Sequence, residues 1–92
     1  MNSKIYEFKT KLIKVPDIDG AYIEIPFDVE KEFGKKRVYV KATFDGYPYE
    51  GSLVRMKTIN HIIGVRKEIR ASINKQAGDT IFVTIKERDR NK

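Results

Sequence analysis

Hydrophobic and polar residues follow the same order of patterns twice along this chain. Residues 21–44 read as an alternating stretch, a short helix-like stretch, a glycine and a second alternating stretch, and residues 61–85 repeat that order. The match lies in the order of elements and in the phase of the apolar positions, whereas residue identities differ. Because units of this kind cannot each cover their own apolar face, the repeat predicts an architecture in which two units complete one another.

The first half is predicted to run strand, strand, helix, strand. The alternation along residues 5–15 shifts phase near its end, which indicates a bulge or burial on both faces. Pro26 ends the second strand because it cannot donate a ladder hydrogen bond. Asp28 is the expected N-cap of a short helix through Phe33, and Gly34 is the expected residue after its end. The expected strands cover residues 5–15, 21–25 and 36–44.

The second half is predicted to repeat this order after a hairpin. Asp45-Gly46 is a strong two-residue turn signal. Val65, Ile69 and Ile73 are spaced as one face of a helix, which Gly78-Asp79 would end. The expected elements are strands over residues 49–56, 62–65 and 81–85 and a helix over residues 66–76.

The whole chain is therefore expected to form one mainly β domain over residues 1–92. Its halves are residues 4–45 and 47–86, two ββαβ units that close a single, partly split β-barrel with two short helices at its ends. Residues 87–92 are wholly polar and are expected to be a frayed tail. Phe82 falls on the face opposite the core, so either a helix covers it, which is the favoured interpretation, or it is exposed and available to a partner such as a second copy of the chain. The predicted shared core contains Val38, Val40, Leu53, Ile69, Val83 and Ile85.

Composition narrows the classes of function. The 92 residues contain no cysteine and a single histidine, His61, so we expect no metal site, no cofactor and no catalytic centre. A structural hydrogen bond to a loop is the expected role of His61. The N-terminal stretch has no apolar core, and no run of eighteen apolar residues occurs, so a cytoplasmic protein outside the membrane is expected.

The net charge of +6 is unevenly distributed. Residues 1–46 hold nine Lys or Arg against eight Asp or Glu, whereas residues 47–92 hold ten against five. A basic half raises the expectation of a polyanionic partner. The candidate anion-binding or nucleic-acid-binding residues are Arg55, Lys57, Arg66, Lys67 and Arg70. The alternative interpretation is an ordinary helix flank, in which Arg66 or Arg70 pairs with Glu68 or Asp79. Arg37, Tyr39 and Lys41 share one strand face and could contact a single strand, but three residues do not distinguish this from cross-strand pairs.

Several segments together resemble a small prokaryotic family of domains of unknown function. They are Pro26-Phe27-Asp28-Val29, Asp45-Gly46 with Gly51-Ser52, and the run from Val65 to Arg70 with Gly78-Asp79. Members of that family occur alone or fused to YdeI/OmpD-associated, bacteriocin-protection-like modules. The resemblance implies a single-chain double-split β-barrel similar in topology to the AbrB/MazE swapped-hairpin dimers. It implies no activity. Members often have glycines where this chain has residues 57–60, so a backbone-mediated ligand contact there is not expected.

We therefore expect a small, non-enzymatic binding or accessory module, monomeric or weakly dimeric, with a protein or small molecule as its unknown partner. Two alternatives stay open at this point. One is a nucleic-acid-binding protein that uses the basic patch, and the other is an enzyme, the least favoured class.

Overall fold

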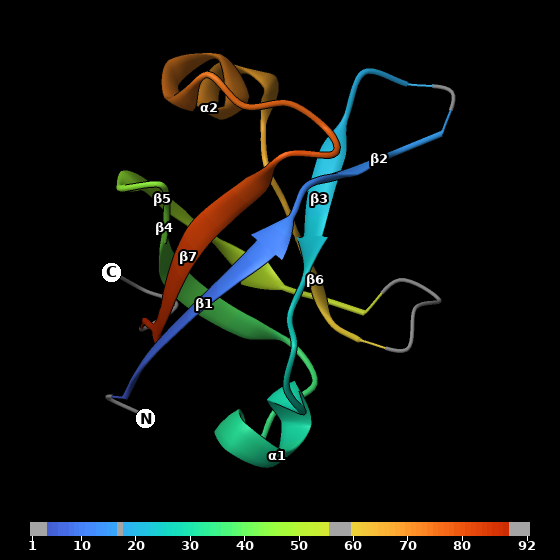
Figure 1. Cartoon of the computed structure of the whole chain (residues 1–92). Coiled ribbons are helices and arrows are strands. Elements are labelled where there is room, and N and C mark those ends of the chain that lie inside the picture. Colours follow the sequence, from blue (N-terminus) through green and yellow to red (C-terminus); the bar gives the residue numbers. More distant parts are fainter. Residues whose placement is uncertain (1–3, 17, 56–59, 89–92) are drawn as a thin grey trace.

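The computed structural model describes residues 4–16, 18–55 and 60–88, and it is mainly β with two short helices. Figure 1 shows the helices at opposite ends of the strands, with α1 at the bottom and α2 at the top of the view. The elements are β1 (Ile5–Lys11), β2 (Ile13–Lys14), β3 (Ala21–Glu24), α1 (Val29–Phe33), β4 (Val38–Phe44), β5 (Tyr47–Leu53), β6 (Ile62–Gly64), α2 (Lys67–Ile73) and β7 (Thr80–Glu87).

The strands form two antiparallel sheets, and each sheet combines strands from both halves of the chain. The larger sheet has the order β1-β7-β4-β5 and the smaller one has the order β2-β3-β6. The last strand of each half, β4 or β7, pairs with the other and with the first strand of the opposite half. The middle strands β3 and β6 also pair with each other. This is the pairing that two equivalent units would produce, and closure into a barrel stays a prediction.

The phase shift near residue 12 marks the place where the chain passes from one sheet to the other. β1 pairs with β7, whereas β2 pairs with β3. Leu12, between them, is buried and exchanges backbone hydrogen bonds with the turn before β7, accepting from Gly78 at 2.8 Å and donating to Asp79 at 2.9 Å. A change of partner sheet therefore explains the shift.

Helix α1 begins and ends as predicted. The Asp28 carboxylate accepts a hydrogen bond from the Lys31 amide at 3.1 Å, and Gly34 follows the helix with a φ of 71°. Glycine adopts this left-handed conformation without the steric cost that a Cβ brings. Its N–H closes the helix on the Glu30 carbonyl.

Helix α2 is shorter than predicted at both ends. It ends at Asn74, which adopts the left-handed conformation with a φ of 57°, four residues before the glycine that was expected to end it. Asparagine tolerates this conformation better than most residues. Val65, expected on the helix face, precedes the helix and donates its amide hydrogen to Ala21 in β3 at 2.9 Å.

The predicted frayed tail over residues 87–92 is wrong at its first residue. Glu87 is the last residue of β7 and only 3% exposed, because its carboxylate forms an ion pair with Lys35. The next amide, that of Arg88, donates to the Tyr39 carbonyl at 2.8 Å. Residues 89–92 lie outside the described part of the chain.

The predicted core is confirmed. All six residues named from the sequence are buried in a single hydrophobic cluster between the sheets, which the partly buried rings of Tyr6, Phe8 and Phe27 extend. Phe82 is 40% exposed and no described helix covers it, so the favoured interpretation, a covering helix, is wrong. Its availability to a partner stays a prediction. The larger sheet therefore has one apolar inner face and one open outer face.

Truncation of an inward and of an outward residue of β4 should have different effects on stability. Val40 is fully buried, so Val40→Ala should lower the free energy of unfolding by about 1–4 kcal/mol. Its neighbour Lys41 is exposed, and Lys41→Ala should change stability by less than about 0.5 kcal/mol. Urea denaturation of both variants measures the difference, and equal losses would contradict the assignment of faces.

Candidate functional site

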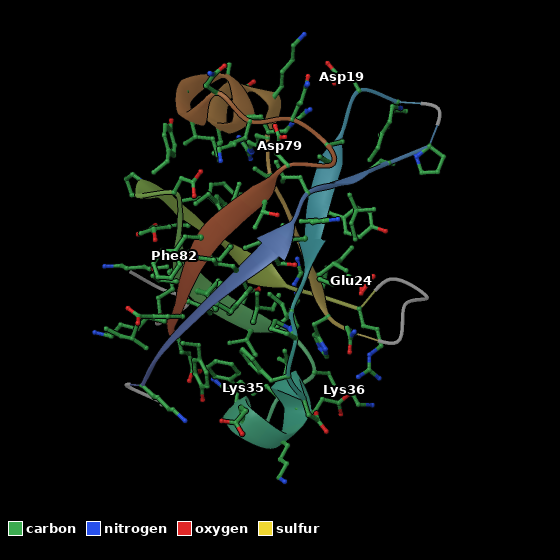
Figure 2. All side chains as sticks on the ribbon, viewed as in Figure 1. Asp19, Glu24, Lys35, Lys36, Asp79 and Phe82 are labelled. Atoms are coloured by element: carbon green, nitrogen blue, oxygen red, sulfur yellow. The ribbon has the colours of Figure 1, made fainter. Side chains whose placement is uncertain are left out.

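Three of the predicted cations converge at the start of α2. Lys67 Nζ lies 3.3 Å from Asp19 Oδ2, and an Arg70 guanidinium nitrogen lies 3.5 Å from Asp19 Oδ1. The guanidinium of Arg66 lies 5.7 Å from the centre of the Tyr49 ring, within the range of a cation–π contact. We call Asp19, Arg66, Lys67 and Arg70 the α2 cluster. Figure 2 shows Asp19 beside the end of the molecule that carries α2.

The side chains of the α2 cluster differ in how strongly neighbouring residues fix them. The Arg70 side chain is 12% exposed, and its Nε donates to the Val65 carbonyl at 3.2 Å, so the guanidinium is fixed. The side chains of Lys67 and Asp19 are 76% and 63% exposed, so water competes with their ion pair. The cluster lines an open hollow of about 270 Å³ together with Tyr49 and the residues from Gly64 to Val65.

Asp19 is the carboxylate that sequence reasoning missed. The hydrogen bond and the charge of Lys67 lower the pKa of Asp19, and Arg70 adds a smaller effect in the same direction. Glu68 and Asp79 were the expected partners, but Asp79 instead accepts a hydrogen bond from the Gln76 amide at 2.9 Å. Asp19 lies between β2 and β3, and nothing local to it in the sequence points to a residue of a helix 48 positions later.

The predicted five-residue patch is divided by the fold. Arg55 forms an ion pair with Glu30 of α1 at 3.5 Å and does not contact the α2 cluster. The reason is the direction of β5, which runs away from the end of the molecule that carries α2 (Figure 1), so that Val54 bridges to Ile62 and Arg55 lies within reach of α1. Lys57 lies outside the described residues.

A second hollow, of about 590 Å³, lies beside α1 and also carries cations. Its lining consists of Glu30, Lys36, Arg37, Val54, Arg55 and His61. The imidazole of His61 is buried, with Nε2 at 2.6 Å from the Lys36 carbonyl oxygen. This contact ties β6 to the connection between α1 and β4, so the predicted hydrogen bond from His61 to a loop is confirmed.

The charged side chains of the two hollows are cations with individual carboxylates. None of the described residues form a group of three or more His, Asp or Glu side chains placed to hold a metal ion. Nε2 of the single histidine is engaged by the Lys36 carbonyl, and each hollow has three Lys or Arg residues and one carboxylate in its lining. Along the ranges that the structure covers, no helix has the length and apolar character needed to cross a membrane.

Removal of the His61 hydrogen bond should destabilise the fold. His61→Phe keeps a buried ring but leaves the Lys36 carbonyl without this partner, which should cost about 1–3 kcal/mol of unfolding free energy. Urea denaturation measures the loss. A change within about 0.5 kcal/mol would contradict the structural role and leave the imidazole open to another one.

Comparisons with known proteins agree with the expectation of a family of unknown function. No curated protein matches the chain significantly. The model of one protein family, a domain of unknown function designated DUF1905, matches residues 8–85 and so covers both halves and both helices. The fusion partners expected from the resemblance stay a prediction. Because the match spans most of the 92 residues, this chain belongs to the DUF1905 family of domains of unknown function.

Proposed function

We propose that the protein is a non-enzymatic binding module of the cytoplasm that recognises an anionic group of its partner at the α2 cluster. The observation that carries this proposal is an excess of cations over carboxylates, because Lys67 and Arg70 share the single carboxylate of Asp19 and Arg66 lies beside them over the Tyr49 ring. Arg66, Lys67 and Arg70 line an open hollow in which Asp19 is the only described carboxylate. The local excess of positive charge favours a second anion there.

Because Arg70 is fixed and Lys67 is exposed, an incoming anion can replace Asp19 as the partner of Lys67. Arg70, held by the Val65 carbonyl, offers a fixed guanidinium that can face a phosphate, sulfate or carboxylate group. Lys67 is exposed and can turn from Asp19 to the incoming oxygen atoms. Asp19 is exposed as well, so its carboxylate returns to water when it is displaced and no buried charge is left unpaired.

The nature of the partner distinguishes two versions of this function. A protein or small molecule would present one anionic group to the α2 cluster, whereas a nucleic acid would present a row of phosphates. The excess of charge in the second half of the chain supports the second version, but the separation of Arg55 from the cluster removes part of that surface. We therefore propose recognition of a single anionic group at this site, by a monomer or weak homodimer.

The architecture is part of the same proposal. We propose that the two sheets are the parts of a single-chain double-split β-barrel, as the family resemblance implies. The support is the pairing of β4 with β7 and of β3 with β6, which joins each half to the other in both sheets.

The pKa of Asp19 provides a direct test of anion binding. Lys67 lowers this pKa, so an anion that engages Lys67 should raise it toward its ordinary value. Sulfate is a suitable probe because it presents a compact group of oxygen atoms that can accept hydrogen bonds from Lys67 and Arg70. NMR titration of the Asp19 carboxyl in sulfate and in chloride of equal ionic strength measures the difference. Sulfate affinity should in turn increase as pH falls through this pKa, because protonated Asp19 no longer competes.

Two variants make this test specific. Lys67→Ala should by itself raise the pKa of Asp19 and remove the effect of sulfate. Lys31→Ala, in α1 at the other end of the molecule, is the matched control and should leave both unchanged. The proposal fails if sulfate and chloride act alike on Asp19 in the wild-type protein, or if the effect of sulfate persists in Lys67→Ala.

A further inference from the structure

The outer face of the four-stranded sheet is an open surface that the α2 cluster does not include. The helices lie at the two ends of the strands (Figure 1), and among the described residues no element covers this face. Phe82 of β7 and Ile5 of β1 are 40% and 57% exposed on it. Figure 2 shows Phe82 on the side of β7 away from β3, which is the side away from the core. A large apolar side chain in this position is exposed at a cost unless something binds it.

Positive charge dominates this face. The strand alternation places six cations and only two glutamates outward on it. Lys9 and Lys11 lie in β1, Lys41 in β4 and Lys86 in β7, and none of these four has an ion-pair partner among the described residues. Arg37 directly precedes β4, and Arg88 directly follows β7. The cations are Lys9, Lys11, Arg37, Lys41, Lys86 and Arg88, and the glutamates are Glu7 and Glu50.

Two of these lysines lie on the central pair of strands. Lys41 of β4 is directly opposite Lys86 of β7 on one side and Glu50 of β5 on the other, so two like charges are held side by side with a single carboxylate next to them. Like charges in opposite positions destabilise a sheet, and a bound anion would relieve that repulsion. Both lysines line a shallow hollow of about 460 Å³, whose lining also includes Ile5, Thr43, Thr84 and the carboxylate of Glu50. The hydroxyls of the two threonines hydrogen-bond to each other at 2.6 Å.

Aromatic rings accompany the cations at both ends of this row. At one end, the guanidinium groups of Arg37 and Arg88 lie 5.9 Å and 5.6 Å from the centre of the Tyr39 ring. At the other end, Phe82 is directly opposite Lys9 on β1. Guanidinium planes and aromatic rings are both surfaces on which unpaired bases stack.

We propose that this outer face binds a single strand of nucleic acid along the β4–β7 pair. The phosphates would lie over Lys41 and Lys86, while bases would stack on Phe82 at one end and on the Arg37–Tyr39–Arg88 group at the other. From Phe82 to Arg88 the strand rises about 20 Å, room for on the order of four nucleotides. This surface is separate from the α2 cluster, and the inference does not depend on the function proposed there.

Single strands fit this face better than duplexes or acidic peptides. A duplex keeps its bases stacked on one another, so its phosphates would meet the lysines but the exposed Phe82 would gain nothing. An acidic peptide offers charge without the flat rings that Phe82 and the Arg37–Tyr39–Arg88 group would stack on. Binding of a single strand should therefore require the aromatic ring of Phe82, whereas binding of a duplex or an acidic peptide should not.

The experiment measures binding of a labelled ten-residue oligothymidylate by fluorescence anisotropy at two salt concentrations. Phe82→Leu keeps an apolar side chain but removes the ring, and it should weaken binding about 5- to 100-fold. Phe82→Trp should bind at least as tightly as the wild type. Replacing both Lys41 and Lys86 with glutamine should lower the slope of log affinity against log salt by about 1.4. Lys31→Gln in α1 is the charge control and should leave affinity and slope unchanged.

Each alternative has a distinct result. Equal binding by Phe82→Leu and wild type, equal binding of a duplex of the same length, or equal binding of an oligoglutamate of matched charge would overturn the proposal. Affinity no tighter than about 1 mM at low salt would also overturn it, as would a dimer in sedimentation equilibrium that Phe82→Leu dissociates. Lys67→Ala should leave oligothymidylate binding intact. Loss of binding in that variant alone would place the nucleic acid at the α2 cluster and refute the sheet site.

Discussion

The pairing of β4 with β7 is the contact on which the other features of this molecule depend. Each is the last strand of its half of the chain, and together they form the centre of the larger sheet. Their inward residues, among them Val40, Ala42, Val83 and Ile85, are almost wholly buried. Neither half could bury these side chains alone, because the partner strand comes from the other half. We therefore expect the chain to unfold as a single cooperative unit, although its sequence contains the same order of elements twice.

This central pair also decides where function can be located. The strands run between the two short helices, so α1 and α2 lie at opposite ends of the molecule (Figure 1). The cations of the second half are therefore divided between the α2 cluster at one end and Arg55 at the other. Because the core lies on one side of the larger sheet, its other side stays open and collects lysines and arginines from strands far apart in sequence. A modest net charge thus becomes several local concentrations of positive charge, each with its own geometry.

Local patterns predicted the elements well, and long-range contacts explain what they missed. The Asp28 cap, Gly34 and the alternation of β4 are local signals, and the structure confirms them. The partners of Glu87 and Asp19 could not be predicted, since Lys35 and Lys67 lie 52 and 48 residues away in sequence and meet them only through the fold. The early end of α2 is an intermediate case, because Asn74 tolerates the left-handed conformation that usually calls for glycine. The register of β4 against β7 brings Lys86 and Arg88 beside Arg37, Tyr39 and Lys41. The sequence alone does not show this register.

Native-state hydrogen exchange tests most directly whether β4 and β7 form the common centre of both halves. If they do, the amides of both strands should exchange only by global unfolding, with the same opening free energy, while the amides of the short strands β3 and β6 open at lower energy. Urea-dependent exchange of each strand distinguishes global from local opening. Opening of β7 at a free energy below that of β4, with β4 still protected, would show that the two halves are independent and would contradict this account.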